Sequence, residues 1–182
     1  MLVLNFFGGP GVGKSTYSAY FYSMLKMRGI NCELVTEYAK QKVWEGNDTI
    51  LSNQVYLFSK QYVGLTKLDG KVELAIMDSP LLLSLLYQSN IKIKDSFYKM
   101  ALDCHSEFDN INYLICGNGN YTNQGRYQSC EEAIKLSSVM KKILDYNEVQ
   151  YRIIQQYTGL DGIDKLNEQI EEIYTLILNK RK

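Results

Sequence analysis

An eight-residue segment near the N-terminus carries the residue types that bind nucleotide phosphates. Gly8-Gly9-Pro10-Gly11-Val12-Gly13-Lys14-Ser15 fits the pattern G-x-x-x-x-G-K-[ST], and Thr16 follows directly. Glycines in this pattern let successive backbone N–H groups turn inward around a β-phosphate, and the following helix adds its N-terminal N–H groups. The lysine reaches the β- and γ-phosphates, and the serine hydroxyl binds Mg²⁺. Segment 8–16 is therefore predicted to bind ATP, or a close relative, with Mg²⁺. We expect Lys14 to act in catalysis and Ser15 to be a metal ligand.

The sequence on either side of this segment supplies the context that the motif needs. Leu2–Phe7 is a continuous apolar run of strand length, and Lys14 to about Arg28 has apolar residues spaced for one buried helix face. A glycine-rich turn with a solvated lysine is the alternative interpretation. The order strand, glycine loop, helix argues against that alternative.

Two acidic residues follow predicted strands. Glu37 comes just after the predicted strand Cys32–Val35, and Asp78 ends the predicted strand Val72–Met77. Ligands of open α/β sheets bind at the carboxyl ends of the strands, where the phosphate segment also lies. Asp78 is predicted to hold Mg²⁺ through water. Glu37 is predicted to be a general base for an acceptor hydroxyl, or a second Mg²⁺ partner. The sequence leaves open which of the two carboxylates takes the proton. The alternative interpretation of each residue is an exposed loop carboxylate without a catalytic role.

One long polar stretch, Gly117–Ser129, interrupts the pattern of predicted helices and strands. It contains Arg126, one of four arginines in the chain. Kinase lids use arginines to neutralise the transferring phosphoryl group and to exclude water. We therefore predict a lid at about residues 117–130 and a catalytic role for Arg126, against the alternative of a solvated loop arginine.

Apolar strand-like runs alternate with helical patterns along the whole chain. Further strands are predicted at Ile111–Cys116 and Gln150–Ile154. Further helices are predicted at Tyr38–Glu45, Ser52 to about Leu68, Leu81–Tyr87, Asp95–Glu107, Glu131–Tyr146 and Asp161 to about Asn179. This alternation predicts an α/β fold with a parallel sheet covered by helices on both faces. The 182 residues form one predicted domain, with the lid as its only appendage.

Composition narrows the classes of partner. The formal net charge is zero and 46% of residues are hydrophobic, so the chain can bury a core and has no overall basic field for a nucleic acid duplex. We expect no membrane partner, do not favour a nucleic acid, and leave a homodimer open. The four cysteines form no C-x-x-C pair and are interpreted as reduced thiols of a cytoplasmic protein. Lysine outnumbers arginine 16 to 4, which suits an AT-rich genome such as that of a phage, whose product would act in the host cytoplasm.

Aromatic and amide side chains on the segments after the second predicted strand suggest an acceptor pocket. Trp44, Tyr38, Tyr56 and Tyr62 have faces on which a base could stack, although core packing is the more common role of tyrosines. Gln54 and Gln61 could hydrogen-bond a base edge, or be ordinary polar helix positions.

These motifs, taken in order, resemble the small AAA-type nucleoside kinase family, which includes the nicotinamide riboside kinase domain of a bacterial NAD regulator, and its phage relatives. The resemblance covers roughly residues 2 to 178. Glu37-Tyr38-Ala39-Lys40 is similar to the family's Glu-Tyr-(Gly/Ala)-Arg, and Asp78-Ser79-Pro80 to its Asp-Thr-Asp without the second acid. The resemblance implies a P-loop NTPase three-layer sandwich with strand order 2-3-1-4-5, and ATP-dependent transfer to a hydroxyl.

Three functions remain after these observations. The first is a kinase that phosphorylates a hydroxyl or phosphate of a nucleoside or nucleoside monophosphate. The second is a kinase that acts on hydroxymethylated bases in phage DNA, which the neutral net charge argues against. The third is a nucleotide-dependent regulatory NTPase. Its GTPase form is disfavoured because Asn179-Lys180-Arg181-Lys182 lacks the aspartate of a guanine-specifying Asn-Lys-x-Asp motif.

Overall fold

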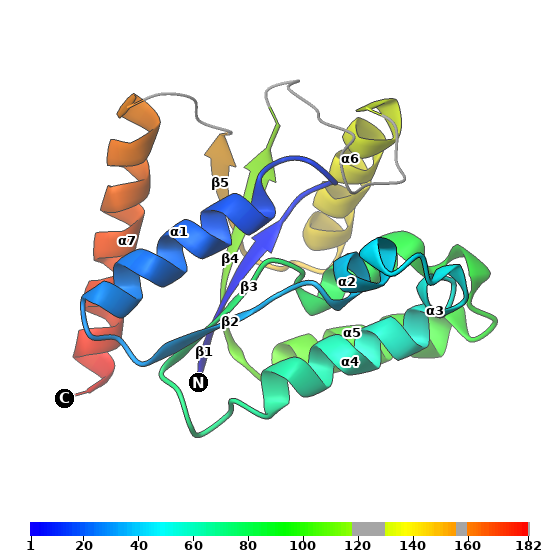
Figure 1. Ribbon diagram of the computed structural model, residues 1–182, viewed down its shortest axis with the longest axis horizontal. Coiled ribbons are helices and arrows are strands. Elements are labelled where there is room, and N and C mark those ends of the chain that lie inside the picture. Colours follow the sequence, from blue (N-terminus) through cyan, green and yellow to red (C-terminus); the bar gives the residue numbers. More distant parts are fainter. Residues whose placement is uncertain (118–129, 156–159, 182) are drawn as a thin grey trace.

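The computed structural model describes residues 1–117, 130–155 and 160–181. Its centre is a five-stranded sheet in the order β2-β3-β1-β4-β5, in which every neighbouring pair is parallel (Figure 1). The strands are β1 (Leu2–Phe7), β2 (Cys32–Val35), β3 (Leu74–Met77), β4 (Asp109–Cys116) and β5 (Arg152–Gln155). Both the predicted fold class and the predicted strand order are confirmed.

Helices connect the strands and cover both faces of the sheet. They are α1 (Lys14–Met27), α2 (Tyr38–Trp44), α3 (Asp48–Leu51), α4 (Gln54–Thr66), the 3₁₀ segment η1 (Leu81–Asn90), α5 (Lys94–Ser106), α6 (Cys130–Tyr146) and α7 (Leu160–Lys180). None of the helices in the described ranges combines the length and apolar character that a membrane span requires.

The alternation of side chains along β1 divides the core into two layers. Leu2, Leu4 and Phe6 pack against α1 and α7 on one face, while Val3 and Phe7 pack against α4, η1, α5 and α6 on the other. Figure 1 shows these two groups of helices on opposite sides of the sheet. Because strands buried on both faces have no solvent side, they read as continuous apolar runs in the sequence.

Three asparagines form a ladder of side-chain hydrogen bonds between the adjacent strands β1 and β4. The Asn5 side chain in β1 donates from Nδ2 to Oδ1 of Asn110 (2.8 Å) and of Asn112 (2.9 Å), both in β4. Asn5 is only 1% exposed, so a shift of β1 along β4 would leave a buried amide without a partner. The ladder therefore helps to fix the register of the strand that presents the glycine segment.

The structure differs from the sequence-based expectation mainly at element ends. The third strand begins at Leu74 and not at Val72, because the backbone N–H of Val72 still donates to Leu68 O in the preceding turn. Residues 46–48, which separate the predicted helices Tyr38–Glu45 and Ser52 to about Leu68, lead into the short helix α3. The Asn47 side chain caps this helix by accepting from the Ile50 N–H.

Candidate active site

The glycine segment forms the predicted loop between β1 and α1. Gly13 has φ +96°, a left-handed conformation that side-chain-bearing residues rarely adopt, and its carbonyl accepts the N–H of Tyr17 to start α1. Lys14 Nζ donates to the carbonyls of Gly8 (3.0 Å) and Gly9 (2.8 Å), so its side chain folds back over the loop. The segment has the strand-loop-helix geometry in which backbone N–H groups surround a phosphate.

The loop is braced from outside by α6. The backbone N–H of Gly9 donates to Ser137 Oγ (3.0 Å), and that hydroxyl donates in turn to Ala133 O (3.0 Å). A Cβ on Gly9 would lie 2.4 Å from both Ser137 Oγ and Ala133 O. Glycine is required here because another helix approaches the backbone closely. Sequence inspection could not find this contact, which joins residues 128 positions apart.

Asp78 lies at the end of β3, in the place that the sequence predicts. It is 5% exposed, and its Oδ1 has no hydrogen-bond partner among the described residues. Burial, and then the nearby charge of Glu37, raise the pKa of Asp78 to about 6, while the neighbouring Ser15 hydroxyl and the charges of Lys14 and Lys40 oppose that rise. The two predicted acids and the phosphate segment therefore meet at one edge of the sheet.

A cavity of about 510 Å³ extends from the phosphate segment to the space between α4 and η1. Such a volume is in the range of small-molecule sites. Glu37 lies on its wall together with Lys14, Ser15 and Lys40. The wall that α3, α4 and η1 contribute carries the apolar or aromatic residues Leu51, Leu57, Phe58, Leu81, Leu83 and Tyr87 together with the polar residues Asp48, Gln54, Gln61 and Ser84. The cavity thus joins the phosphate segment to a wall that combines apolar surface with polar side chains.

The predicted acceptor-pocket residues divide into two groups. Gln54 and Gln61 line the cavity, as the sequence suggested. Trp44 is 70% exposed, Tyr38 pairs with Tyr56 through their hydroxyls (3.3 Å), and none of the three is on the cavity wall. Tyr62 donates to Glu107 (2.6 Å) and stacks on Phe58, so its role is in packing. Arg126 and the centre of the predicted lid lie outside the described residues.

The cavity also uses residues that sequence reasoning missed. Leu83, Ser84 and Tyr87 of η1 line the wall together with residues of α4. The sequence predicts only a helix at Leu81–Tyr87. The position of this segment directly after Asp78 is the signal that could place it beside the site, since ligands of such sheets bind beyond the strand ends.

Comparison with known proteins supports the fold. No protein-family model matches the chain, and no curated protein sequence matches it. Among solved structures, it is similar to deoxyadenosine kinase from M. mycoides with the products dCMP and a flexible dCDP bound. The TM-score is 0.54 and the identity 18%, over 99% of this chain and 98% of that one. The same kinase with bound dATP gives a TM-score of 0.51 and 19% identity over the same shares. The chain has the fold of these P-loop proteins.

Proposed function

We propose that the chain is an ATP-dependent kinase that transfers the γ-phosphoryl group to a hydroxyl or phosphate of a nucleoside or nucleoside monophosphate. The observation that carries this proposal is a cavity lined both by the phosphate segment with Glu37 and by apolar and polar residues of α3, α4 and η1. A regulatory NTPase needs a phosphate site but has no need of a roomy cavity that continues beyond it. The similar fold of a kinase solved with dATP, and with dCMP and dCDP, supports the same class of ligand.

The phosphate end would bind ATP. Backbone N–H groups of residues 8–16 would surround the phosphates, and Lys14 would exchange its bonds to Gly8 O and Gly9 O for phosphate oxygens. Ser15 and Asp78 fit Mg²⁺, because they supply a hydroxyl and a buried carboxylate whose Oδ1 lacks a hydrogen-bond partner within residues 1–117, 130–155 and 160–181. When bound, Mg²⁺ would neutralise charge on the β- and γ-phosphates.

Glu37 is the better candidate for the general base. It lies on the cavity wall together with the phosphate segment, whereas Asp78 is buried and is not among the residues that line the cavity. In the proposed step the acceptor oxygen bonds to the γ-phosphorus, and its proton passes to the Glu37 carboxylate. The bond from the γ-phosphorus to the β–γ bridging oxygen breaks, and ADP leaves.

The test is ADP release by the purified protein with ATP and Mg²⁺, with a panel of nucleosides, nucleoside monophosphates and nicotinamide riboside as acceptors. We expect ADP that depends on an acceptor and that vanishes in Lys14→Ala. Circular dichroism of the variant would establish that it still folds. ADP formed equally without any acceptor would contradict the proposal and favour a nucleotide switch. ADP that appears only with DNA containing hydroxymethylated bases would favour the DNA-directed kinase.

A further inference from the structure

The peptide group between Gly8 and Gly9 is held from both sides. Its N–H, that of Gly9, donates to Ser137 Oγ on α6 (3.0 Å), and its C=O, that of Gly8, accepts from Lys14 Nζ (3.0 Å). The N–H and C=O of a trans peptide point in opposite directions, so Ser137 and Lys14 lie on opposite sides of this peptide. Ser137 therefore determines which way the Gly8 carbonyl points, and with it one of the groups that hold Lys14.

The Ser137 hydroxyl acts toward Gly9 as an acceptor. Its own proton is donated to Ala133 O, one helical turn earlier in α6 (3.0 Å), and a backbone N–H can only donate. Gly9 is buried in the structure. Without the hydroxyl, the Gly9 N–H would lose the acceptor that the structure gives it, and a buried N–H without a partner is costly.

The two glycines make this peptide easy to turn. A rotation of its plane by about 180° changes ψ of Gly8 and φ of Gly9 and leaves the chain on either side in place. Because neither residue has a Cβ, both signs of these angles are accessible. In the turned state the Gly8 carbonyl would point toward α6, and Lys14 would lose one of the oxygens that hold it. Hydrogen bonds, more than steric limits, keep the peptide in the orientation observed.

The neighbouring serine separates this contact from the stability of the helix. Ser138 Oγ donates to Ile134 O (3.2 Å), which is the same bond within α6 that Ser137 makes to Ala133 O. Ser138 is exposed, and no hydrogen bond joins it to the phosphate segment within the described residues. The two hydroxyls thus contribute alike to α6, and they differ in the contact with Gly9.

We infer that Ser137 is a positioning residue for ATP: it locks the Gly8–Gly9 peptide, so that the phosphate segment keeps its shape when Lys14 leaves the two carbonyls for the phosphates. Ser137 does not line the cavity and acts through Gly9. Its loss should therefore weaken the binding of ATP and leave the binding of the acceptor unchanged. This inference rests on the ATP site of the proposed function and not on the identity of the acceptor.

The experiment is a calorimetric titration of wild type, Ser137→Ala and Ser138→Ala with ATP and Mg²⁺. In Ser137→Ala we expect the Kd for ATP to rise about 5- to 20-fold, because only a fraction of the molecules then holds the peptide in the binding orientation. Ser138→Ala, which removes the matching bond within α6, should stay within about two-fold of wild type. An unchanged Kd in Ser137→Ala would overturn the inference, as would an equal rise in both variants.

A second pair of variants keeps the test valid if Ser137→Ala does not fold, which circular dichroism would show. Threonine and valine have nearly the same shape, and only threonine has the hydroxyl. Ser137→Thr should bind ATP more tightly than Ser137→Val by about the same 5- to 20-fold. Equal affinities of the two variants would overturn the role of the hydroxyl.

Steady-state ADP release separates positioning of ATP from a general loss of structure. In Ser137→Ala we expect the KM for ATP to rise, while the KM for the acceptor and kcat at saturating ATP change by less than about two-fold. A fall in kcat with no change in the KM for ATP would contradict the inference.

The outcomes also separate this inference from the proposed function. ATP binding that depends on Ser137, without acceptor-dependent ADP release, would support the inference and contradict the kinase. Acceptor-dependent ADP release with an unchanged Kd in Ser137→Ala would remove the inference and leave the kinase in place. Absence of ATP binding in the wild-type protein would contradict both.

Discussion

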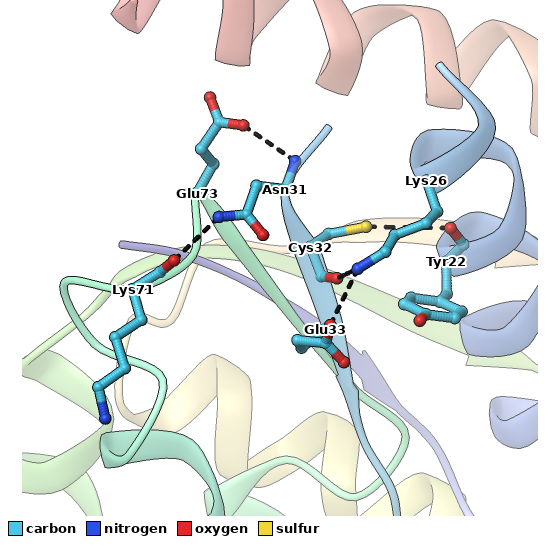
Figure 2. Close-up of polar contacts among 7 residues, drawn as sticks. All are labelled: Tyr22, Lys26, Asn31, Cys32, Glu33, Lys71 and Glu73. Carbon is cyan, nitrogen blue, oxygen red and sulfur yellow. Dashed lines mark hydrogen bonds and ion pairs between the residues drawn. The ribbon is translucent and has the colours of Figure 1, made fainter. Parts of the chain in front are cut away.

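The two ends of strands β2 and β3 differ in whether their polar groups have hydrogen-bond partners. At the carboxyl ends, where Glu37 and Asp78 follow the strands, Asp78 Oδ1 and the nearby Gln61 Nε2 are buried without a hydrogen-bond partner among the described residues. At the amino ends, polar side chains bond to one another and to the backbone, and Figure 2 shows this arrangement around Asn31. The same two strands thus have a candidate binding site at their carboxyl ends and a hydrogen-bonded network at their amino ends.

The amino end is closed by a network that draws on distant parts of the chain. The backbone N–H of Asn31 donates to the Glu73 carboxylate (3.0 Å), and the Asn31 side chain donates to Lys71 O (2.9 Å) (Figure 2). Lys26 Nζ donates to Cys32 O (2.7 Å) in the same region. Arg181, which follows α7, adds hydrogen bonds to Glu73 and to Gly29 O.

This contrast shows which end contributes stability and which end retains the capacity to bind. Polar groups that hydrogen-bond within the chain stabilise the fold and have no free capacity to bind a ligand. Buried polar groups without a partner destabilise the fold, and a ligand that hydrogen-bonds them binds more tightly. Substitutions at the carboxyl ends should therefore change activity, and substitutions at the amino ends should change stability alone.

The largest effect is expected from removing the base. In Glu37→Gln we expect kcat to fall by about 10² to 10⁴, because the amide cannot take the acceptor proton, with the KM for ATP almost unchanged. Steady-state ADP release measures both quantities. Glu33→Gln makes the same change near the other end of β2, where Glu33 pairs with Lys26, and should leave kcat within about two-fold of wild type. A Glu37→Gln variant with near-normal kcat would assign the base elsewhere.

The next effect concerns the buried carboxylate at the end of β3. Because the pKa of Asp78 is raised from 3.8 to about 6, the folded state binds this proton more tightly than the unfolded state. Its contribution to the free energy of unfolding therefore falls as the pH rises from about 4 to 6, by roughly 3 kcal/mol in all. Asp78→Asn should remove this pH dependence, raise stability above pH 6 and lower activity.

Urea unfolding of wild type and Asp78→Asn across pH 4 to 8 measures the difference directly. Asp103→Asn, which replaces an exposed carboxylate on α5, provides the matched control. If the free energy of unfolding depends on pH in the same way for wild type and Asp78→Asn, burial does not destabilise the Asp78 carboxylate. The proposed difference between the two strand ends would then fail at Asp78.

The smallest effect is expected at the amino ends. Hydrogen bonds from Arg181, and from the Asn31 N–H, hold the pKa of Glu73 below its ordinary value of 4.5, so its contribution to stability is present above that pH and is lost as the pH falls. Glu73→Gln should lower the free energy of unfolding by about 1 kcal/mol at pH 7 without changing kcat. A double-mutant cycle with Arg181→Met, measured by urea unfolding, would isolate the interaction free energy between Glu73 and Arg181. A loss of activity in either variant would contradict the separation of the two ends.

Much of the fold and part of the site could be predicted from local sequence. Apolar strand runs, the spacing of Gly8, Gly13 and Lys14, and the acids directly after two strands are all short-range patterns, and parallel topology brings them to one edge. Strand order came from the resemblance to a family and not from periodicity.

The rest depends on contacts that no local pattern encodes. The bond from the Tyr38 N–H to Gln61 Oε1 joins residues 23 positions apart, and it ties helix α4 to the start of α2. Tyr38, Trp44 and Tyr56 were considered for stacking because of their residue type. Their exposure and mutual contacts are set by the packing of α2 on α4, which sequence spacing does not show.

The hydrogen bond from the Gly9 N–H to Ser137 Oγ affects when the growing chain can bind nucleotide. The phosphate segment leaves the ribosome before α6, which supports it and is made more than 120 residues later. A nascent chain that ends after β4 has the complete nucleotide motif but not the hydroxyl that receives the Gly9 N–H. We expect such a chain to bind ATP weakly, so the nucleotide motif becomes functional only once α6 has been made and has docked.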